Sequence, residues 1–446
     1  QFHCSLLFCD SYVCVFASSL ADHAKVLSSP LRFNFVDDKM KYIDFVDLNY
    51  EPREEEVICD FYVEPEGLSI EEAAGGVAAE SSIGTWTEVG TMKPYVTRLH
   101  ATVFSIKNSN VRISYPIELF EFGNMPNIIS SIAGNVFGLR ALRNLRLNDI
   151  HFPAKLLRSF KGPKYGIPGI RRLLKVKDRP LVGTIIKPKL GLVTKDHAKV
   201  AYEAWVGGCD IVKDDENLGS QSFNRFENRL RKTLESRDKA EAETDEKKVY
   251  LVNVTSETKE MLKRAQLVED QGGEYAMLDV LTCGYSALQT LRNKDFNLIL
   301  HAHRAGHAAF TKNPKHGISM RVISNLIRII GCDQLHVGTA VGKMSETREE
   351  VLENCSALRE PLSGIKTALP VASGGLHPGS VPDLLEIFGR DFVIQAGGGI
   401  HGHREGTISG ARAMRQAVDA AIQGIPLNEY AKDHKELEIS LKDWTS

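Results

Sequence analysis

Beyond residue 180, eight short apolar runs recur at fairly regular intervals, and a helix-length stretch follows each of them. The runs are LVGTIIKPK (181–189), CDIVKDD (209–215), KVYLVNV (248–254), YAMLDV (275–280), NLILHAHR (297–304), QLHVGTA (334–340), LPVASGG (369–375) and FVIQAGGG (392–399). Strands this apolar are typical of parallel sheets buried on both faces, and eight strand–helix repeats favour a (β/α)8 TIM barrel. The alternative, a Rossmann fold, is disfavoured because no GxGxxG follows the first strand.

The residues before this region show a mixed pattern that predicts a compact α+β domain over 40–163. EVICDFYVEP (56–65) alternates like a half-buried strand, SIEEAAGGVAAESS (69–82) opens with a capping-box pair, and the segment 95–119 is typical of paired strands. The segment 153–174, rich in Pro, Gly and basic residues, marks the crossing into the second domain. We expect that domain, the barrel with a C-terminal helical tail, to span 164–446.

Residues 1–39 do not fit either domain. Their apolar tract is interrupted by Asp10 and lacks a basic n-region, so it predicts neither a membrane span nor a signal peptide. Met40 resembles a natural start. We therefore expect residues 1–39 to be a non-native or upstream extension.

Composition narrows the class of protein. With 43% hydrophobic and 25% charged residues, the chain has the composition of a soluble globular enzyme. The 55 basic and 57 acidic residues give a net charge of -2, which indicates no bulk attraction to nucleic acid or to a membrane surface. Eight cysteines without a CxxC pair indicate scattered reduced thiols and a cytoplasmic location.

The stretch DIVKDDEN sets one lysine, Lys213, among the carboxylates of Asp210, Asp214, Asp215 and Glu216. A solvated charged loop would be the ordinary interpretation. At the end of a strand, however, Lys213 and Asp215 would point the same way, with Glu216 just beyond. Two carboxylates suit Mg²⁺, and the amine becomes a third oxygen ligand if CO₂ converts it to a carbamate.

Other candidate residues stand at the carboxyl ends of the predicted strands, where TIM barrels place their chemistry. Lys187 and Lys189 end the first run and would share a face, so that a neighbouring cation could lower a lysine pKa. His303, Arg304, His336 and Lys343 end or follow the fifth and sixth runs, and glycine-rich turns that could approach a phosphate end the last two. Each of these residues alone is weak support for an active site. Their predicted convergence on one rim of the barrel is stronger support.

These residues together resemble the large subunit of ribulose-1,5-bisphosphate carboxylase/oxygenase (RuBisCO). The resemblance covers about residues 45–425 through AAESSIGTW, GNVFG, GTIIKPKLGL, GGCDIVKDDEN, HAHRAGHA, LHVGTAVGK, PVASGG and QAGGG, in family order. YIDFVDLNYEP is most similar to the archaeal form III branch. The family relation implies a ferredoxin-like N-terminal α+β domain before the barrel, and homodimers paired head to tail that can assemble further into a ring.

Position by position, the resemblance implies roles for many residues. Carbamylated Lys213 would hold Mg²⁺ with Asp215 and Glu216, and Lys187, Lys213, His303 and Lys343 would serve the carboxylation of ribulose 1,5-bisphosphate by CO₂, with O₂ competing. The substrate would be bound by Lys189, Arg304, His336, Ser373, Gly374, Gly375, Gly397 and Gly398. Glu80, Thr85, Trp86 and Asn135 would come from the neighbouring chain. Form III resemblance also implies a role in nucleoside monophosphate salvage.

Two departures and two rival functions remain. LVNVTSETKEM and GHREGT differ from the family's usual turns after the third and eighth strands, changes expected to alter rate or gas specificity. The rivals are a RuBisCO-like enolase or isomerase of methionine salvage and a non-catalytic assembly subunit. Both predict loss of some of Lys213, Asp215, Glu216 and Lys343, and the sequence retains all four.

Overall fold

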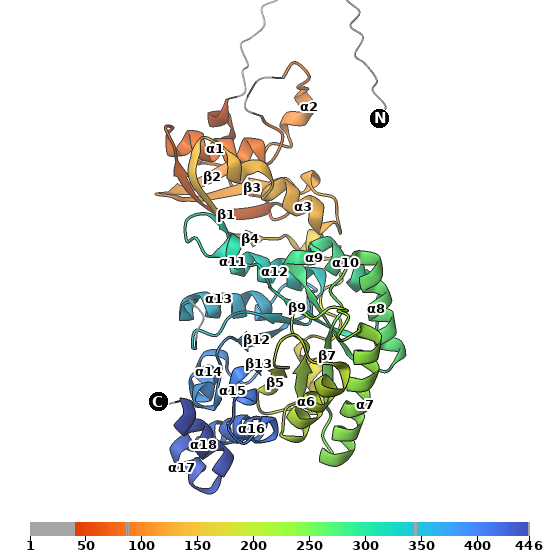
Figure 1. Ribbon diagram of the computed structural model, residues 1–446. Coiled ribbons are helices and arrows are strands. Elements are labelled where there is room, and N and C mark those ends of the chain that lie inside the picture. Colours follow the sequence, from red (N-terminus) through yellow and green to blue (C-terminus); the bar gives the residue numbers. More distant parts are fainter. Residues whose placement is uncertain (1–40, 86, 88, 343–345, 445–446) are drawn as a thin grey trace, which may run out of the picture. The chain divides into compact units, whose positions relative to one another are not determined.

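The computed structural model describes residues 41–85, 87, 89–342 and 346–444. Its strands divide into a five-stranded sheet and a closed eight-stranded barrel (Figure 1). The sheet contains β1 (Val57–Pro65), β2 (Thr102–Lys107), β3 (Asn110–Tyr115), β4 (Leu142–His151) and β10 (Gly317–Ile318). The barrel contains β5 (Leu181–Ile185), β6 (Ile211–Lys213), β7 (Val249–Asn253), β8 (Tyr275–Asp279), β9 (Ile299–His303), β11 (Gln334–His336), β12 (Leu369–Ser373) and β13 (Val393–Ala396).

The helices alternate with these strands. The α-helices are α1 (Ile70–Glu80), α2 (Pro94–Thr97), α3 (Met125–Ile132), α4 (Ala154–Leu157), α5 (Gly166–Leu174), α6 (Thr194–Val206), α7 (Phe226–Thr244), α8 (Thr258–Asp270), α9 (Val280–Cys283), α10 (Tyr285–Asn293), α11 (Ala308–Thr311), α12 (Met320–Ile330), α13 (Arg348–Arg359), α14 (Val381–Phe388), α15 (Gly398–His401), α16 (Thr407–Gln423), α17 (Leu427–Tyr430) and α18 (Lys435–Trp444). Short 3₁₀ turns are η1 (Tyr42–Phe45), η2 (Ile117–Leu119), η3 (Asn135–Gly138), η4 (Pro378–Ser380) and η5 (Ala431–Asp433).

The N-terminal sheet has the ferredoxin-like arrangement expected from the family resemblance. Its strand order is β10-β4-β1-β3-β2, and β1 pairs antiparallel with both β3 and β4. Helix α1 begins with the predicted capping box, in which Ser69 Oγ accepts from the Glu72 amide and the Glu72 carboxylate accepts from the Ser69 amide. The fifth strand, β10, was not predicted, and it comes from the barrel part of the chain to pair in parallel with β4.

One predicted strand pair begins later than expected. The segment 95–119 forms β2 and β3, but its first residues belong to the short helix α2. Pro94 stands at the first position of this helix, where its fixed φ and missing N–H favour a helical start.

The barrel confirms the TIM-barrel prediction and excludes the Rossmann alternative. All eight predicted apolar runs form its strands, which close in the order β11-β12-β13-β5-β6-β7-β8-β9 with every pair parallel. One hydrophobic cluster joins Ile170 and Leu174 of α5 to strand residues including Leu181, Ile211 and Val249. These strand residues lie at or near the amino ends of their strands, so apolar packing fills that end of the barrel and leaves the carboxyl ends for polar groups.

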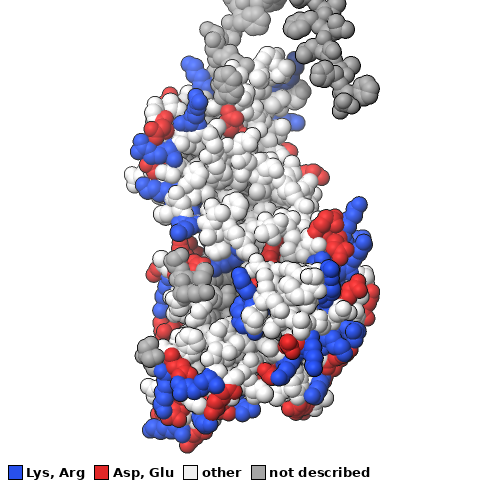
Figure 2. Space-filling model, in the orientation of Figure 1, with Lys and Arg blue, Asp and Glu red and all other residues white. Residues whose placement is uncertain are grey.

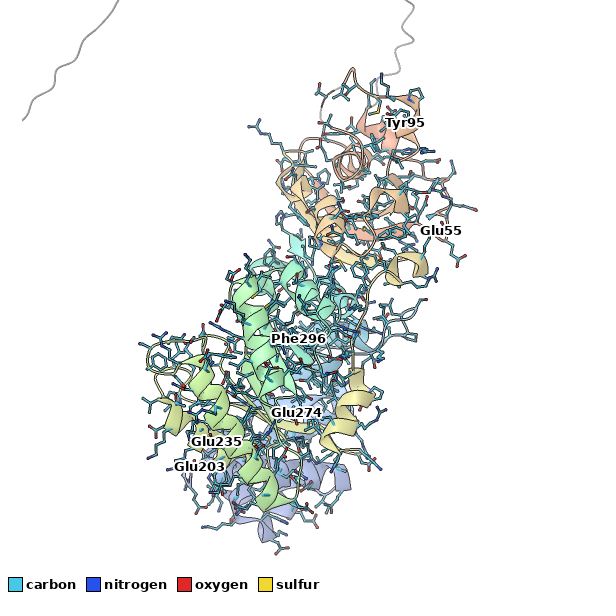
Figure 3. The ribbon with its side chains drawn as sticks, turned by 90° about the vertical axis from the view of Figure 1, so that its right-hand side faces the viewer. Glu55, Tyr95, Glu203, Glu235, Glu274 and Phe296 are labelled. Atoms are coloured by element: carbon cyan, nitrogen blue, oxygen red, sulfur yellow. The ribbon has the colours of Figure 1, made fainter. Side chains whose placement is uncertain are left out.

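The surface carries charges of both signs, as expected from the near balance of basic and acidic residues. Lys and Arg are interspersed with Asp and Glu over the outer helices on the face shown in Figure 2. Figure 3 marks Glu203 on α6 and Glu235 on α7 in this outer layer, and Glu235 pairs with Arg231 at 3.1 Å, both about half exposed. Such pairs contribute little to stability.

The cysteines of the described part, Cys59, Cys209, Cys283, Cys332 and Cys355, are free thiols. Among the described residues, no helix is long and apolar enough to cross a membrane.

Candidate active site at the barrel rim

The carboxylates around Lys213 divide into two groups. Asp210 receives two hydrogen bonds of 2.7 Å from the guanidinium of Arg179. Asp214, on the other side of the strand from Lys213, accepts from Arg229 Nε at 3.1 Å and from the Tyr250 hydroxyl at 2.5 Å. Both aspartates are almost completely buried and serve structural pairs. Asp215 and Glu216 are therefore the carboxylates left for the rim.

Lys213 ends β6 with its side chain fully buried. Its Nζ donates to the carbonyl oxygen of Asp214 at 2.7 Å and lies 3.6 Å from Glu216 Oε2. Burial lowers the pKa of Lys213, although the neighbouring carboxylates, Glu216 foremost, oppose the shift. A lowered pKa increases the fraction of neutral amine, which is the form that reacts with CO₂.

Asp215 faces the rim and pairs with Lys187. Its Oδ2 accepts from Lys187 Nζ at 2.8 Å, and its Oδ1 accepts from the Asn217 side-chain amide at 3.0 Å. Burial opposes ionisation, but these hydrogen bonds outweigh it and lower the pKa of Asp215. Lys187 and Lys189 both follow β5, which ends at Ile185. Lys189 is exposed, and its predicted common face with Lys187 stays a prediction.

Two polar residues that the sequence analysis missed, Asp279 and Asn253, lie beside Glu216 and His303. Asp279 Oδ1 lies 2.7 Å from His303 Nδ1, and His303 Nε2 lies 3.7 Å from Glu216 Oε2. Asn253 donates to the backbone oxygen of Glu216 at 2.9 Å, which ties the rim after β6 to the end of β7. Asp279 and Asn253 are the last residues of β8 and β7, and this position at a strand's carboxyl end is the signal that could have identified them.

His336, at the end of β11, connects to the next strand. Its Nδ1 lies 2.6 Å from the Ser373 hydroxyl, and its ring is edge-on to His303 with centroids 4.7 Å apart. Burial, followed by the nearby histidines and cations, lowers the pKa of His336 well below its ordinary value. The imidazole is therefore neutral at neutral pH and can donate or accept a hydrogen bond.

The glycine turns after β12 and β13 lie beside these groups. Gly374 has a φ of +125°, a conformation that side-chain-bearing residues rarely adopt. A Cβ on Gly397 would lie 3.1 Å from Lys187 Cε, so this turn approaches Lys187 closely. Gly375 and Gly398 are the second residues of the two turns. Glycines at these places leave backbone N–H groups open to an anion.

Arg304 follows His303 and is almost fully buried. Its Nη2 donates to Glu346 Oε1 at 2.5 Å. The sequence analysis did not identify Glu346, which lies 42 residues away from Arg304 along the chain.

The predicted site residues of the N-terminal domain lie on α1, η3 and the segment after α1. Glu80 ends α1 and accepts a hydrogen bond from the Tyr42 hydroxyl at 3.1 Å, within the same domain. Asn135 begins η3 and is exposed, and Thr85 is half-buried. The predicted residues Trp86 and Lys343 lie outside the described residues.

The residues at the end of β6 fit the predicted magnesium site. No group of three or more His, Cys, Asp or Glu in the described part of the chain is arranged to hold a metal. Asp215 and Glu216 supply two hard oxygen ligands beside the buried amine of Lys213, so a third anionic oxygen there requires carbamylation of Lys213. The fit therefore depends on that modification.

Fold and rim together define a TIM-barrel enzyme with a buried lysine, two carboxylates, cationic side chains and glycine turns at the carboxyl ends of its strands. The ribulose bisphosphate carboxylase large chain family matches this chain in two parts, its N-terminal domain over 44–156 and its catalytic domain over 166–444. The chain belongs to this family and is an enzyme of the ribulose bisphosphate carboxylase type.

Its relatives include archaeal proteins. The ribulose bisphosphate carboxylase of Pyrococcus furiosus is 51% identical, covering 90% of this chain and 97% of its own, and that of Methanosarcina acetivorans is 50% identical, covering 90% and 99%. Octameric RuBisCO from Pyrococcus horikoshii, solved with sulfate, has a TM-score of 0.89 at 50% identity over 91% of this chain and 97% of its own. Dimeric RuBisCO from Hyperthermus butylicus has a TM-score of 0.86 at 46% identity over 90% and 99%.

Proposed function

We propose that the chain carboxylates ribulose 1,5-bisphosphate to two molecules of 3-phosphoglycerate, with O₂ competing for the same intermediate. The observation that carries the proposal is the buried amine of Lys213, which has a lowered pKa and stands beside Asp215 and Glu216. A fully buried lysine is costly to keep charged, and its ion-pair partner Glu216 is no closer than 3.6 Å. Conversion to a carbamate explains why it is placed there.

The metal site would be made by carbamylated Lys213, Asp215 and Glu216. A bound Mg²⁺ would supply Lewis-acid polarisation of the C2 carbonyl and C3 hydroxyl of the substrate. The carbamate on Lys213 would take the proton from C3, which would give an enediolate. Asp215 now holds Lys187 Nζ. Exchange of that contact for the metal would leave Lys187 free to act as a proton donor.

The other rim residues would position the substrate and complete the reaction. His303, oriented by Asp279, and Ser373, bonded to His336, would contact the sugar hydroxyls. CO₂ adds at C2, and Lys343 would stabilise the new carboxylate. After hydration and cleavage of the C2–C3 bond, Lys187 would protonate the departing carbanion at C2.

The two phosphates need separate anion sites at this rim. Arg304 and His336 would hold one phosphate, with Lys189 supporting Lys187. The turns of Gly374, Gly375, Gly397 and Gly398, with Thr85 and Trp86, would hold the other. Backbone N–H groups and local cations suit this task in a chain whose net charge is -2.

The site would be completed by a second copy of the chain. Glu80, Thr85, Trp86 and Asn135 would be supplied by the partner's N-terminal domain, in a homodimer that can form larger rings. Resemblance to the form III branch favours nucleoside monophosphate salvage as the pathway. The domain boundaries at 40–163 and 164–446, with 1–39 as an extension, remain part of this proposal.

The direct test is formation of labelled 3-phosphoglycerate from labelled bicarbonate under anaerobic conditions with Mg²⁺. Lys213→Arg keeps the positive charge but cannot form the carbamate, and Lys343→Ala removes the proposed carboxylate stabiliser. We expect each to lower turnover by at least about 100-fold, as loss of a central electrostatic group does. Lys195→Ala, on the outside of α6, is the control and should retain full activity.

A second readout separates carbamylation from other roles of Lys213. Wild-type protein should show CO₂-dependent Mg²⁺ binding, and Lys213→Arg should not. Phosphoglycerate formation by Lys213→Arg at the wild-type rate would refute the assigned role. An active methionine-salvage enolase that makes no phosphoglycerate would refute the carboxylase itself, and binding of the bisphosphate without any turnover would favour the assembly subunit.

A further inference from the structure

Glu346 pairs with the guanidinium of Arg304, the group to which the proposed function assigns a substrate phosphate. The side chains of Arg304 and Glu346 are only 6% and 12% exposed, and a single hydrogen bond joins Arg304 Nη2 to Glu346 Oε1. His307 Nε2 lies 3.9 Å from the same carboxylate oxygen. A carboxylate therefore already satisfies part of the proposed phosphate site.

This ion pair is incompletely satisfied. Among the described residues, Arg304 Nη1 and Glu346 Oε2 are buried without a hydrogen-bond partner. Burial lowers the pKa of Arg304, and Glu346 only partly offsets that effect. Buried charges with unused donors and acceptors are costly, so the guanidinium would gain from an anion with more oxygens.

The surroundings leave room for such an exchange. Arg304 and Glu346 both line a cavity of about 260 Å³, which Arg146, Arg321 and Glu353 also border. Gly338, with a φ of +94°, lets the pair approach the backbone, because a Cβ there would lie 3.2 Å from Glu346 Cδ and 3.3 Å from Arg304 Nη2. The carboxylate therefore has a space beside it into which it can turn without unfolding the barrel.

We propose that Glu346 is an internal competitor for the substrate phosphate at Arg304 and so sets the affinity of the enzyme for its bisphosphate. This inference rests on the proposed function, in which Arg304 binds a phosphate. A phosphate carries about two negative charges and three terminal oxygens, so it can satisfy both Nη groups where the carboxylate satisfies one. Part of the binding free energy is then used to displace Glu346.

The alternative is that Glu346 only neutralises Arg304 and does not compete with the ligand. The two roles differ in their effect on phosphate affinity once the charge is removed. A partner that only neutralises charge acts through the local potential, so its loss should change phosphate affinity no more than loss of another carboxylate of the same cavity. A competitor that is lost strengthens phosphate binding beyond that effect. Both roles predict that the variant is less stable without ligand, so its affinity for phosphate is the deciding measurement.

The variant is Glu346→Gln, and the probes are inorganic phosphate and ribulose 1,5-bisphosphate. We expect lower thermal stability without ligand, and a dissociation constant for inorganic phosphate that is lower by about tenfold, the smaller end of the range for a hydrogen bond to a charged group. The KM for the bisphosphate should fall in the same direction. Glu346→Asp, whose carboxylate is one methylene shorter, should give a smaller change and serves if the glutamine variant folds poorly.

The matched control is Glu353→Gln, which removes the same charge from the same cavity. Among the described residues, the Glu353 carboxylate makes no hydrogen bond or ion pair with Arg304. It acts on Arg146, whose burial-lowered pKa it raises, so phosphate affinity should change little. In the double variant Arg304→Ala/Glu346→Gln the gain in affinity should disappear. Unchanged or weaker phosphate binding by Glu346→Gln, or an equal gain in Glu353→Gln, would overturn the inference. If the wild-type protein made no phosphoglycerate, the proposed function would fail instead, independently of this comparison.

Discussion

At the scale of single residues, Asp214 and Asp215 are neighbours in the chain with opposite tasks. Asp214 faces α6 and α7, where it meets His197 and Arg229, and Asp215 faces the rim, where it meets Lys187. The alternation of side chains therefore continues for two residues past the end of β6 at Lys213. The sequence could predict this division from the period of a strand. It could not predict which cations bind Asp210 and Asp214, because Arg179 and Arg229 lie 31 and 15 residues away without a recognisable spacing.

The two aspartates should therefore fail in different ways when neutralised. Asp214→Asn leaves Arg229 buried without its counter-charge, and we expect the free energy of unfolding to fall by about 3–5 kcal/mol. Asp215→Asn should change stability little and reduce turnover by at least about 100-fold. Urea denaturation and the carboxylation assay measure the two effects. Equal loss of stability in both variants would contradict the assignment.

The pH dependence of stability has a defined sign at Asp214. Burial opposes its ionisation, but Arg229, His197 and Tyr250 outweigh this and lower the pKa of Asp214. Its stabilising contribution is therefore fully present above the ordinary aspartate pKa and is lost as the pH falls below that value toward the folded pKa. Asp214→Asn should remove this acid-dependent part of the denaturation profile.

At the scale of elements, strand ends and helix caps determine where the candidate groups stand. The eight apolar runs predicted the barrel strands because buried parallel strands require continuous apolar residues. The paired lysines of KPK stand past Ile185, the last residue of β5, so the strand pattern alone does not decide which way their side chains point. The two-residue strand β10 could not be predicted, since it is too short for a periodic pattern and is fixed by pairing with β4.

Helix α13 begins with a capping box directly after Glu346. Thr347 Oγ1 accepts from the Glu350 amide and the Glu350 carboxylate accepts from the Thr347 amide, directly after Glu346. The pattern Thr-Arg-Glu-Glu is the sequence signature of this capping box. The start of α13 was therefore predictable from sequence, whereas the contact of Glu346 with Arg304 was not.

Thr347→Ala should weaken this helix start by about 1 kcal/mol, the usual cost of a lost N-cap. The measurement is hydrogen exchange at the Glu350 amide, which should accelerate about fivefold if exchange follows that local free energy. Thr347→Asp preserves an N-cap acceptor and should restore protection. Faster exchange in Thr347→Asp equal to that of Thr347→Ala would show that the hydroxyl does not cap α13.

At the scale of the whole molecule, the proposed site needs groups from two parts of the chain. Lys213, Asp215 and Glu216 stand on the barrel, whereas Glu80 ends α1 and bonds Tyr42 within the N-terminal domain. The similar protein from Hyperthermus butylicus is dimeric and that from Pyrococcus horikoshii is octameric. Sequence periodicity carries no information on such assembly, because it describes how one chain packs against itself.

A shared site predicts that two inactive variants can restore each other. Glu80→Gln would disable the N-terminal contribution and Lys213→Arg the barrel contribution, so each pure homodimer would be inactive. In a mixed dimer with two-fold symmetry, one site carries both substitutions and the other carries neither. After co-expression in equal amounts, half of the dimers are mixed and each has one intact site, so about a quarter of wild-type activity should return. Mixing the variants without exchange of subunits should restore none. A shared site leaves one site of the mixed dimer without any substitution. Absence of activity in purified mixed dimers would therefore show that each chain builds its site alone.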